Sequence, residues 1–301
     1  MIKKNALVIG GAGFIGHHLV KYLNLKNFKV GVLDNLSSGN KNNLSSINNF
    51  YHEDILNQIS LNKIIKKYDS IFHLAAKVEL QESILNPSDT FQNNITGTSN
   101  VVESCIKFKK RLIFASSCSV YPLNQKKKFK ESHKTSPSSP YSISKDMGEK
   151  IINYYLNRKK INASILRCFN VYGKKQNIKS KYAAVIPKFI HNAKNYKNLK
   201  LNNGGKQSRD FVYVDDVCKA YLLLNNNKVS GTYNIGSGTP TTIKDLAKMI
   251  IKIVGRGKIA KGIKLNDDAE FSCANVEKIK NIGFKGFTKL SDGLKKVVSY
   301  E

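Results

Sequence analysis

Residues 6–23 read ALVIGGAGFIGHHLVKYL, an apolar segment, a glycine-rich turn and an amphipathic segment in direct succession. The pattern predicts a buried strand followed by a helix. Gly10 and Gly13 lie between the expected strand and the expected helix, and Gly16 lies near the start of the helix. Glycine lets the backbone turn sharply, lets a pyrophosphate approach and lets the helix pack close to the strand. Because a helix N-terminus offers free N–H groups and a positive dipole end, we expect phosphate groups to bind there.

A second apolar segment, FKVGVLD at 28–34, follows the expected helix and ends at Asp34. An acidic residue about 20 residues beyond such glycines accepts hydrogen bonds from the adenosine ribose hydroxyls. Its negative charge would repel a 2′-phosphate. The sequence therefore predicts that the bound dinucleotide is NAD rather than NADP.

Apolar strands and helical stretches continue to alternate after this unit. Further strands are expected at 69–76, 111–117 and 162–169, with helices between them that include about 89–108 and 142–157. This succession predicts an α/β fold with a Rossmann-type, doubly wound parallel sheet. We expect residues 1–171 to form the NAD-binding domain. Residues 172–301 are expected to form mainly a smaller substrate-binding lobe, with about 209–236 returning to the first domain.

The bulk composition of the 301 residues restricts the class of protein. No apolar run is long enough to span a membrane, and the first residues lack the cleavage region of a signal peptide. The five cysteines show no CxxC spacing, so we expect reduced thiols, a cytoplasmic location and no metal site. The net charge of +29 comes from lysines spread along the chain. We interpret it as compositional bias rather than as a nucleic-acid surface.

A candidate acid/base pair lies in the run SPYSISKDMGEK at 139–150. Tyr141 and Lys145 are four residues apart, so on a helix their side chains share one face. A lysine ammonium beside a phenol favours the phenolate, which could accept a proton from an alcohol near neutral pH. The pair predicts proton transfer at a hydroxyl group beside the dinucleotide.

With these residues in place, the chain resembles the extended short-chain dehydrogenase/reductases, and within them the NAD-dependent nucleotide-sugar epimerase/dehydratase family. The resemblance runs from Gly10 to about Gly293. Its signatures, in family order, are GGAGFIG (10–16), DNLSSG (34–39), HEDI (52–55), HLAA (73–76), NNITGT (93–98), SSCSVY (116–121), YSISK (141–145), RCFNVYG (167–173), RDFVYVDDV (209–217) and YNIGSGTP (233–240).

The resemblance implies a role for each matching position. The catalytic residues would be Ser117, Tyr141 and Lys145. Those that bind NAD would be Gly10, Gly13, Phe14, Ile15, Gly16, Asp34, Asn35, Ser38, Gly39, Asp54, Ile55, Leu74, Ala75, Ala76, Asn94, Tyr141 and Lys145. Those that bind the nucleotide sugar would be Val78, Ser117, Cys118, Ser119, Tyr141, Asn170, Val185, Arg209 and Ser272. The resemblance also implies a homodimer built from the helices near 89–108 and 142–157.

The segment after Ser117 bears on the reaction. Family members that eliminate water carry Asp-Glu there, and those that decarboxylate carry Glu at the second position. This chain has Cys118 and Ser119. The resemblance therefore implies oxidation and re-reduction at one carbon, which is 4-epimerisation, with UDP the commonest nucleotide of the family.

Two positions near Ala274 depart from the family or vary within it. An Arg that holds the diphosphate in many epimerases is replaced by Glu270. At the position of Ser272, a bulky Tyr in some members excludes N-acetyl groups, whereas the small Ser leaves room for them.

Other functions stay open. The protein could be a reductase, a 3,5-epimerase, a dehydratase or a decarboxylase of the same family. It could also be a catalytically idle NAD-binding protein that has a regulatory role or binds RNA.

Overall fold

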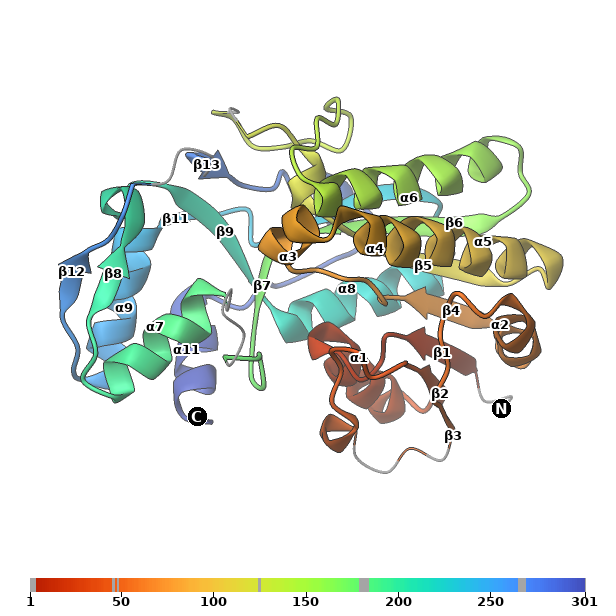
Figure 1. Cartoon of the computed structure of the whole chain (residues 1–301), viewed down its shortest axis with the longest axis horizontal. Coiled ribbons are helices and arrows are strands. Elements are labelled where there is room, and N and C mark those ends of the chain that lie inside the picture. The colour runs from red at the N-terminus through yellow and green to blue at the C-terminus, as the bar shows by residue number, and fades with distance from the viewer. Residues whose placement is uncertain are drawn as a thin grey trace. The chain divides into compact units, whose positions relative to one another are not determined.

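The computed structural model describes residues 4–44, 47, 49–123, 126–178, 184–264 and 269–300. Figure 1 shows how the chain runs through its helices and strands. The contacts divide the chain into two compact units. Unit 1 comprises Met1–Val120, Thr135–Arg167 and Cys218–Tyr233, and unit 2 comprises Tyr121–Lys134, Cys168–Val217 and Asn234–Glu301.

Unit 1 is organised by a seven-stranded sheet of order β10-β6-β5-β4-β1-β2-β3. Its strands are β1 (Asn5–Ile9), β2 (Lys29–Leu33), β3 (Asn49–Tyr51), β4 (Ser70–His73), β5 (Arg111–Ser117), β6 (Asn162–Cys168) and β10 (Gly231–Ile235). The pairs from β3 through β2, β1 and β4 to β5 are parallel. This is the strand order of a Rossmann fold, in which the direction of winding reverses beside β1.

Helices cover both faces of this sheet (Figure 1). They are α1 (Phe14–Leu25), α2 (Gln58–Ile65), α3 (Leu80–Leu85), α4 (Pro87–Phe91), α5 (Gly97–Lys107), α6 (Pro140–Asn157) and α8 (Val214–Asn227). Apolar residues of α2, α5 and α6 join those of β1, β4, β5 and β6 in one buried cluster. The apolar strands predicted a sheet buried on both faces, and the α/β, Rossmann-type prediction is confirmed.

The expected helix at 89–108 is interrupted in a way that the sequence did not predict. Between α4 and α5 the chain makes a π-helical turn at Gln92–Thr96, with Asn94 buried inside it. A π turn adds a residue to the helical repeat, so the side chains beyond it point in a new direction. The turn aims Asn94 at the loop that follows β4.

Unit 2 has its own sheet and its own core. β9 (Ser208–Tyr213) pairs with β7 (Asn170–Tyr172), β11 (Pro240–Thr242) and β13 (Phe271–Ser272), and β8 (Leu199–Leu201) pairs with β12 (Ile259–Lys261). The helices are α7 (Val185–Lys194), α9 (Ile243–Val254), α10 (Glu277–Asn281) and α11 (Leu290–Val298). Apolar side chains of α7, α9 and α11 pack with those of β7, β8 and β9.

The division of the chain differs from the expected boundary near residue 171. Residues 121–134 fall in unit 2, because Phe129 exchanges backbone hydrogen bonds with Cys273 and Asn275 at 2.8 Å each. The part that returns to unit 1 is 218–233, shorter than the expected 209–236. The first difference arises from contacts between segments more than 100 residues apart, and the second from the pairing of β9 with β7, β11 and β13 of unit 2. Among the described residues, no helix is long and apolar enough to cross a membrane.

Candidate functional site

The glycine-rich turn joins β1 to α1 in unit 1. Gly10 has a φ of +81°, and a Cβ there would lie 2.5 Å from the backbone nitrogen of Ala75. A Cβ on Gly16 would lie 2.1 Å from the carbonyl oxygen of Gly10. Gly13 is the N-cap of α1 and provides no side-chain cap, and the first turn, which starts with Phe14 and Ile15, holds no acidic residue. The turn therefore brings backbone close to backbone and presents uncapped N–H groups to an anion.

Asp34 ends β2 and ties the glycine-rich turn to the neighbouring strand. Its Oδ2 accepts from the backbone N–H of Ala12 and its Oδ1 from that of Leu36, both at 2.8 Å. Gly39 fits against this carboxylate, since a Cβ there would lie 3.0 Å from Oδ1. Each carboxylate oxygen has a second lone pair, so a ribose hydroxyl could still donate to Asp34.

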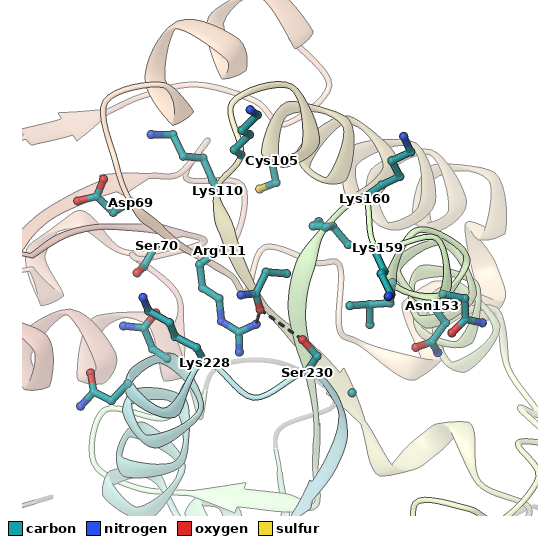
Figure 2. A pocket seen from close by; sticks show the side chains of 18 of the residues that line it. Asp69, Ser70, Cys105, Lys110, Arg111, Asn153, Lys159, Lys160, Lys228 and Ser230 are labelled. Atoms are coloured by element: carbon teal, nitrogen blue, oxygen red, sulfur yellow. Dashed lines mark hydrogen bonds between the residues drawn. The ribbon is translucent and has the colours of Figure 1, made fainter.

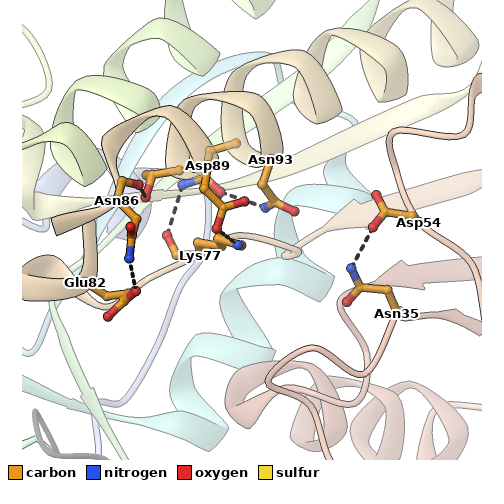
Figure 3. Close-up of polar contacts among 9 residues, drawn as sticks. Asn35, Asp54, Lys77, Glu82, Asn86, Asp89 and Asn93 are labelled. Carbon is orange, nitrogen blue, oxygen red and sulfur yellow. Dashed lines mark hydrogen bonds and ion pairs between the residues drawn. The ribbon is translucent and has the colours of Figure 1, made fainter. Parts of the chain in front are cut away.

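Further expected NAD-binding residues lie beside this carboxylate. The Asn35 amide donates to Asp54 at 2.8 Å (Figure 3). Asp54 also accepts from the N–H of Leu56 at 2.8 Å. Ser38 is exposed, whereas Ile55 is buried in the core of unit 1. The side chain of Ile55 is therefore occupied by packing, so only its backbone could face a ligand.

The loop after β4 is fixed by Asn94. This amide accepts from the N–H of Lys77 at 2.8 Å and donates to the Lys77 carbonyl at 3.0 Å and to Ser144 of α6 at 2.9 Å. Lys77 also forms an ion pair with Asp89 of α4 (Figure 3). Backbone hydrogen bonds hold Leu74 and Ala75 to β1, followed by Ala76 and the exposed Val78. Asn94 thus acts as a clamp within unit 1.

Tyr141 lies in the first turn of α6, and local sequence explains why the helix starts there. Ser139 is the N-cap and forms a reciprocal capping box with Ser142, and Pro140 occupies the first helical position. The backbone N–H of Tyr141 donates to the Ser83 hydroxyl of α3 at 3.2 Å. These contacts hold the start of α6, and with it the half-buried Tyr141, in one orientation.

Lys145 lies one turn further along α6 and is buried. Its ammonium donates to the carbonyl of Ala115 at 2.9 Å and lies 4.9 Å from the centre of the Phe114 ring. A cation over an aromatic face is stabilised by the ring quadrupole. The carbonyl and the ring therefore position the ammonium above the end of β5.

His73 is a residue of this site that the sequence reasoning missed. It ends β4, is fully buried, and its Nε2 lies 3.0 Å from the Thr98 hydroxyl. Burial and, to a smaller extent, the positive charge of Lys145 lower the pKa of His73 to about 3. The imidazole is therefore neutral near pH 7. Its place at the start of the HLAA motif was the available signal.

Ser117 ends β5 and begins the short segment 117–119. Its hydroxyl accepts from the N–H of Ser119 at 3.2 Å. Cys118 and Ser119 are half-buried, and the Ser119 hydroxyl oxygen is buried without a hydrogen-bond partner. No carboxylate occurs in this segment. The segment can offer hydroxyl groups to a ligand but no carboxylic acid.

The remaining expected residues lie in unit 2, on and around β9. Arg209 is paired in register with Ser272 of β13 and with Thr241 of β11. Paired residues of neighbouring strands share a face of the sheet, so the three side chains lie side by side. The Arg209 guanidinium donates to the carbonyls of Ser208 at 2.8 Å and Ala269 at 2.6 Å. Glu270 is exposed.

Two other expected residues of unit 2 flank this strand. The Asn170 amide of β7 donates to the carbonyl of Asp210 at 3.3 Å. Val185 is the first residue of α7, whose N-terminus has no side-chain cap. Asn170 is therefore held to β9 beside Arg209, whereas Val185 belongs to a helix start.

Asp210 is a second residue whose role the sequence did not reveal. Its carboxylate is fully buried and accepts from the N–H groups of Ser237, Gly238 and Ala274 and from the Ser237 hydroxyl, at 2.6 to 3.0 Å. Burial raises the pKa of Asp210, whereas these hydrogen bonds favour the ionised form and lower the pKa. The effect of burial is the larger one, so the pKa is raised overall. Asp210 joins β9 to the segments on either side and so fixes Arg209 opposite Ser272.

The chain is similar to known enzymes that act on nucleotide sugars. The model of the NAD dependent epimerase/dehydratase family matches residues 6–236. The chain belongs to this family. It is 36% identical over 98% of its length to a Methanocaldococcus jannaschii protein named provisionally as a UDP-glucose 4-epimerase, of which it covers 97%.

Solved structures of this family have the same fold. A UDP-N-acetylglucosamine 4-epimerase of Methanobrevibacter ruminantium, in complex with UDP-N-acetylmuramic acid, has a TM-score of 0.94 at 34% identity and covers 100% of this chain and 98% of its own. A UDP-glucose 4-epimerase of Thermotoga maritima with UDP-glucose has a TM-score of 0.92 at 32% identity, with 98% of both chains covered. Dehydratases and decarboxylases of nucleotide sugars are also among the relatives.

NAD is the cofactor of the family, and several of its members were crystallised with NAD. The geometry of unit 1 fits this group. The close approaches at Gly10 and Gly16 leave no room for side chains beside the uncapped start of α1. Asp34, fixed at the end of β2, places a negative charge beside the glycine-rich turn.

Proposed function

We propose that the protein is a nucleotide-sugar 4-epimerase, which interconverts the gluco and galacto forms of a UDP-hexose or UDP-N-acetylhexosamine. The observation that carries this proposal is the segment after Ser117. Cys118 and Ser119 bear no carboxylate, so the segment lacks the carboxyl groups that dehydratases of the family are expected to use for proton transfer at the neighbouring sugar carbons. Elimination of water requires such a group, whereas 4-epimerisation does not.

NAD would be held by unit 1 and would supply the oxidant for the sugar carbon. The N–H groups at the start of α1 would bind the pyrophosphate, beside Gly10, Gly13 and Gly16. Asp34 would accept from the adenosine ribose. Asn94, which clamps the loop after β4, would keep Ala75 and Ala76 in place along the dinucleotide.

Tyr141 would be the general base and acid. As a phenolate it takes the proton of the sugar 4-hydroxyl, and it returns a proton to the same oxygen when the opposite epimer forms. The buried ammonium of Lys145, one helical turn away, favours the phenolate. Ser117 would hydrogen-bond the sugar oxygen and hold it towards Tyr141.

The neutral state of His73 is consistent with this role of Lys145. A second cation at the end of β4 would compete with the Lys145 ammonium for hydrogen-bond acceptors and would repel it. Burial keeps His73 uncharged, with its pKa at about 3, so Lys145 remains the cation of this cluster near neutral pH.

Unit 2 would contribute the residues that bind the nucleotide sugar. The Arg209 guanidinium suits a diphosphate, because its planar fork can donate two parallel hydrogen bonds. Ser272, opposite Arg209 in the sheet, would lie near the sugar C2 substituent and leave room for an N-acetyl group. Asn170 and Val185 would be the further substrate-binding residues of unit 2. In unit 1, this role would fall to Val78, Cys118 and Ser119.

We further propose that the protein is a homodimer formed through α6 and the helices beside it. Ile143, Met147 and Tyr154 are exposed large apolar side chains on α6, and Ile84 and Leu85 are exposed on the adjoining α3. Residues 143, 147 and 154 repeat at helical spacing, so they form one apolar stripe. Size-exclusion chromatography with light scattering should give twice the chain mass, and a monomer at micromolar concentration would contradict the dimer.

The experiment that tests the function is product analysis by proton NMR. Purified protein is incubated separately with UDP-glucose, UDP-N-acetylglucosamine, UDP-glucuronate and dTDP-glucose. We expect galacto epimers of one or both of the first two, approached from either direction to the same equilibrium ratio. A 6-deoxy-4-keto product would instead indicate a dehydratase, and a pentose from UDP-glucuronate would indicate a decarboxylase.

A further inference from the structure

A cavity of about 940 Å³ lies in unit 1, at the edge of the sheet opposite to the candidate site (Figure 2). Its lining includes the first residues of four strands: Ser70 of β4, Arg111 of β5, Asn162 of β6 and Gly231 of β10. Gly10 and Ser117, by contrast, stand at the carboxyl ends of β1 and β5. The cavity therefore belongs to no part of the proposed epimerase site, and its size is that of a small-molecule pocket.

The lining of this cavity is strongly cationic. Among the described residues it contains seven lysine and arginine side chains and one carboxylate, that of Asp69. The cations come from Lys4 and from three connections between a helix and a strand, at 109–111, 159–160 and 228. In Figure 2, Lys110, Lys159, Lys160 and Lys228 surround Arg111. Residues distant in sequence thus contribute charge of one sign to one concave surface.

Arg111 gives this surface a buried charge that lacks a carboxylate partner. Only 9% of the surface of Arg111 is exposed. Its guanidinium donates to the Ser164 hydroxyl and to the carbonyls of Leu224 and Val229 at 2.6 to 3.1 Å. It also donates to the side-chain oxygen of Asn162. All four acceptors are neutral, and the Nε–H has no partner. Burial lowers the pKa of Arg111 to about 10. A buried cation of this kind is stabilised by an anion.

A second residue of the cavity lining also has a buried polar atom without a partner. Asn225 of α8 is 6% exposed, and its side-chain oxygen has no hydrogen-bond partner. Unsatisfied polar atoms are rare inside proteins and often mark a site for water, an ion or a ligand. An amide can turn its nitrogen or its oxygen towards a ligand, so it could donate to an anion here.

Helix dipoles explain part of this charge but not all of it. α5, α6 and α8 end at the cavity, and each C-terminus carries about half a negative charge, so lysines there are favourable. The three ends together offset only about 1.5 of the positive charges. Even when the negative charge of Asp69 is added to these helix ends, the cavity lining keeps a net positive charge.

The chemistry of the lining points to phosphate groups. None of the described lining residues is aromatic, so the surface offers no platform on which a nucleobase could stack. A single compact cavity also does not follow the extended backbone of a nucleic acid. We propose that this cavity is a binding site for a small anion with several phosphate groups, such as inorganic polyphosphate or the phosphate chain of a nucleotide.

Calorimetric titration with inorganic tripolyphosphate tests the proposal, with the intact protein saturated with NAD so that the glycine-rich turn is occupied. We expect one equivalent to bind, with affinity that falls as salt rises from about 20 to about 300 mM, since screening weakens such contacts. The variant Lys110→Gln/Lys160→Gln should bind about tenfold more weakly or worse, because two ammonium groups are lost. A parallel titration with ATP distinguishes a nucleotide from inorganic polyphosphate as the source of the phosphates.

The matched control is Lys63→Gln/Lys188→Gln, which removes the same charge from exposed positions of α2 and α7 outside the cavity. It should change the affinity less than about twofold, on the scale of a screened surface charge. Equal loss in the two double variants would show that tripolyphosphate responds to net charge alone and would overturn the proposal. Absence of binding to the NAD-saturated protein at low salt would overturn it as well. Circular dichroism confirms that each variant is folded.

Discussion

The glycine-rich turn of unit 1 and the β9–β13 pair of unit 2 are both candidates to bind phosphate, and they are built in different ways. The turn uses backbone N–H groups, packed so closely that a Cβ at Gly16 would lie 2.1 Å from a carbonyl oxygen. The strand pair uses the side chains of Arg209 and Ser272, which lie side by side on a sheet. Backbone sites tolerate no added atom, whereas side-chain sites can change by degrees. We therefore expect all-or-none effects in unit 1 and graded, substrate-dependent effects in unit 2.

The largest effect is expected at Tyr141. Replacement of Tyr141 by Phe should lower turnover by at least about 10²-fold, the usual scale for loss of a positioned general base. The NAD content and the unfolding curve should stay unchanged, because the half-buried hydroxyl has no part in the cap of α6. Tyr154→Phe, on an exposed position of the same helix, is the control and should remain active. Full activity of the Tyr141 variant would break the assignment of catalysis to unit 1.

Gly16→Ala tests whether the turn is as intolerant as its geometry indicates. The added Cβ meets backbone atoms of Gly10 and Gly11, which cannot move aside as a side chain can. We expect a loss of about 3 kcal/mol in the free energy of unfolding, at the upper end of the range for overpacking, together with loss of bound NAD. Gly13→Ala is matched to it, since its Cβ would lie 3.3 Å from Gly10 O. Chemical denaturation of the two variants should separate them, and equal stabilities would contradict the account of the turn.

His73 offers a pH-dependent test of the packing behind Lys145. Its pKa is lowered to about 3 in the folded protein, whereas in the unfolded chain it is near 6.5. The unfolded state therefore gains a proton as the pH falls through 6.5, and the folded state does not. Between pH 7 and 5 this residue should lower the free energy of unfolding by about 2 kcal/mol. Denaturation of His73→Gln at both pH values should show a dependence reduced by this amount, and an unchanged dependence would place the histidine in a solvated environment.

The smallest and most selective effect is expected in unit 2. Ser272→Tyr should weaken the use of UDP-N-acetylglucosamine and spare UDP-glucose, because the larger side chain fills space near the C2 substituent. Overpacking costs about 1–3 kcal/mol, which corresponds to about 5- to 150-fold in kcat/KM. Competition kinetics with both substrates measures the ratio directly. If kcat/KM falls equally for both substrates, the side chain at position 272 does not discriminate between substituents at the sugar C2.

The same contrast explains how much could be predicted from sequence. The turn at Gly10–Gly16 is set by neighbours in sequence, so its spacing predicted it. The helix expected at about 142–157 starts slightly earlier, at Pro140, where Ser139 caps it. The alternation of strands and helices likewise predicted the parallel sheet.

Residues that depend on distant partners were not predictable in this way. The neutral state of His73 depends on burial against Thr98 and on Lys145, 72 residues away. The Asp210 carboxylate is defined by N–H groups from Ser237 to Ala274. The π-helical turn at Gln92–Thr96 brings Asn94 to Ser144, which lies 50 residues further along the chain. Such contacts form only when the chain is folded, and no local spacing records them.

The fate of hydrogen when the reaction runs in D₂O shows most directly whether the protein is a 4-epimerase. If the protein is a 4-epimerase, with Tyr141 acting on the hydroxyl oxygen alone, proton NMR should show a galacto product that keeps protium at C4 and at C5. This is expected because the segment at Ser117, Cys118 and Ser119 provides no carboxylate to exchange a carbon-bound proton. Deuterium at C5, or a 6-deoxy product labelled at C6, would show acid/base chemistry at those carbons and would contradict the account.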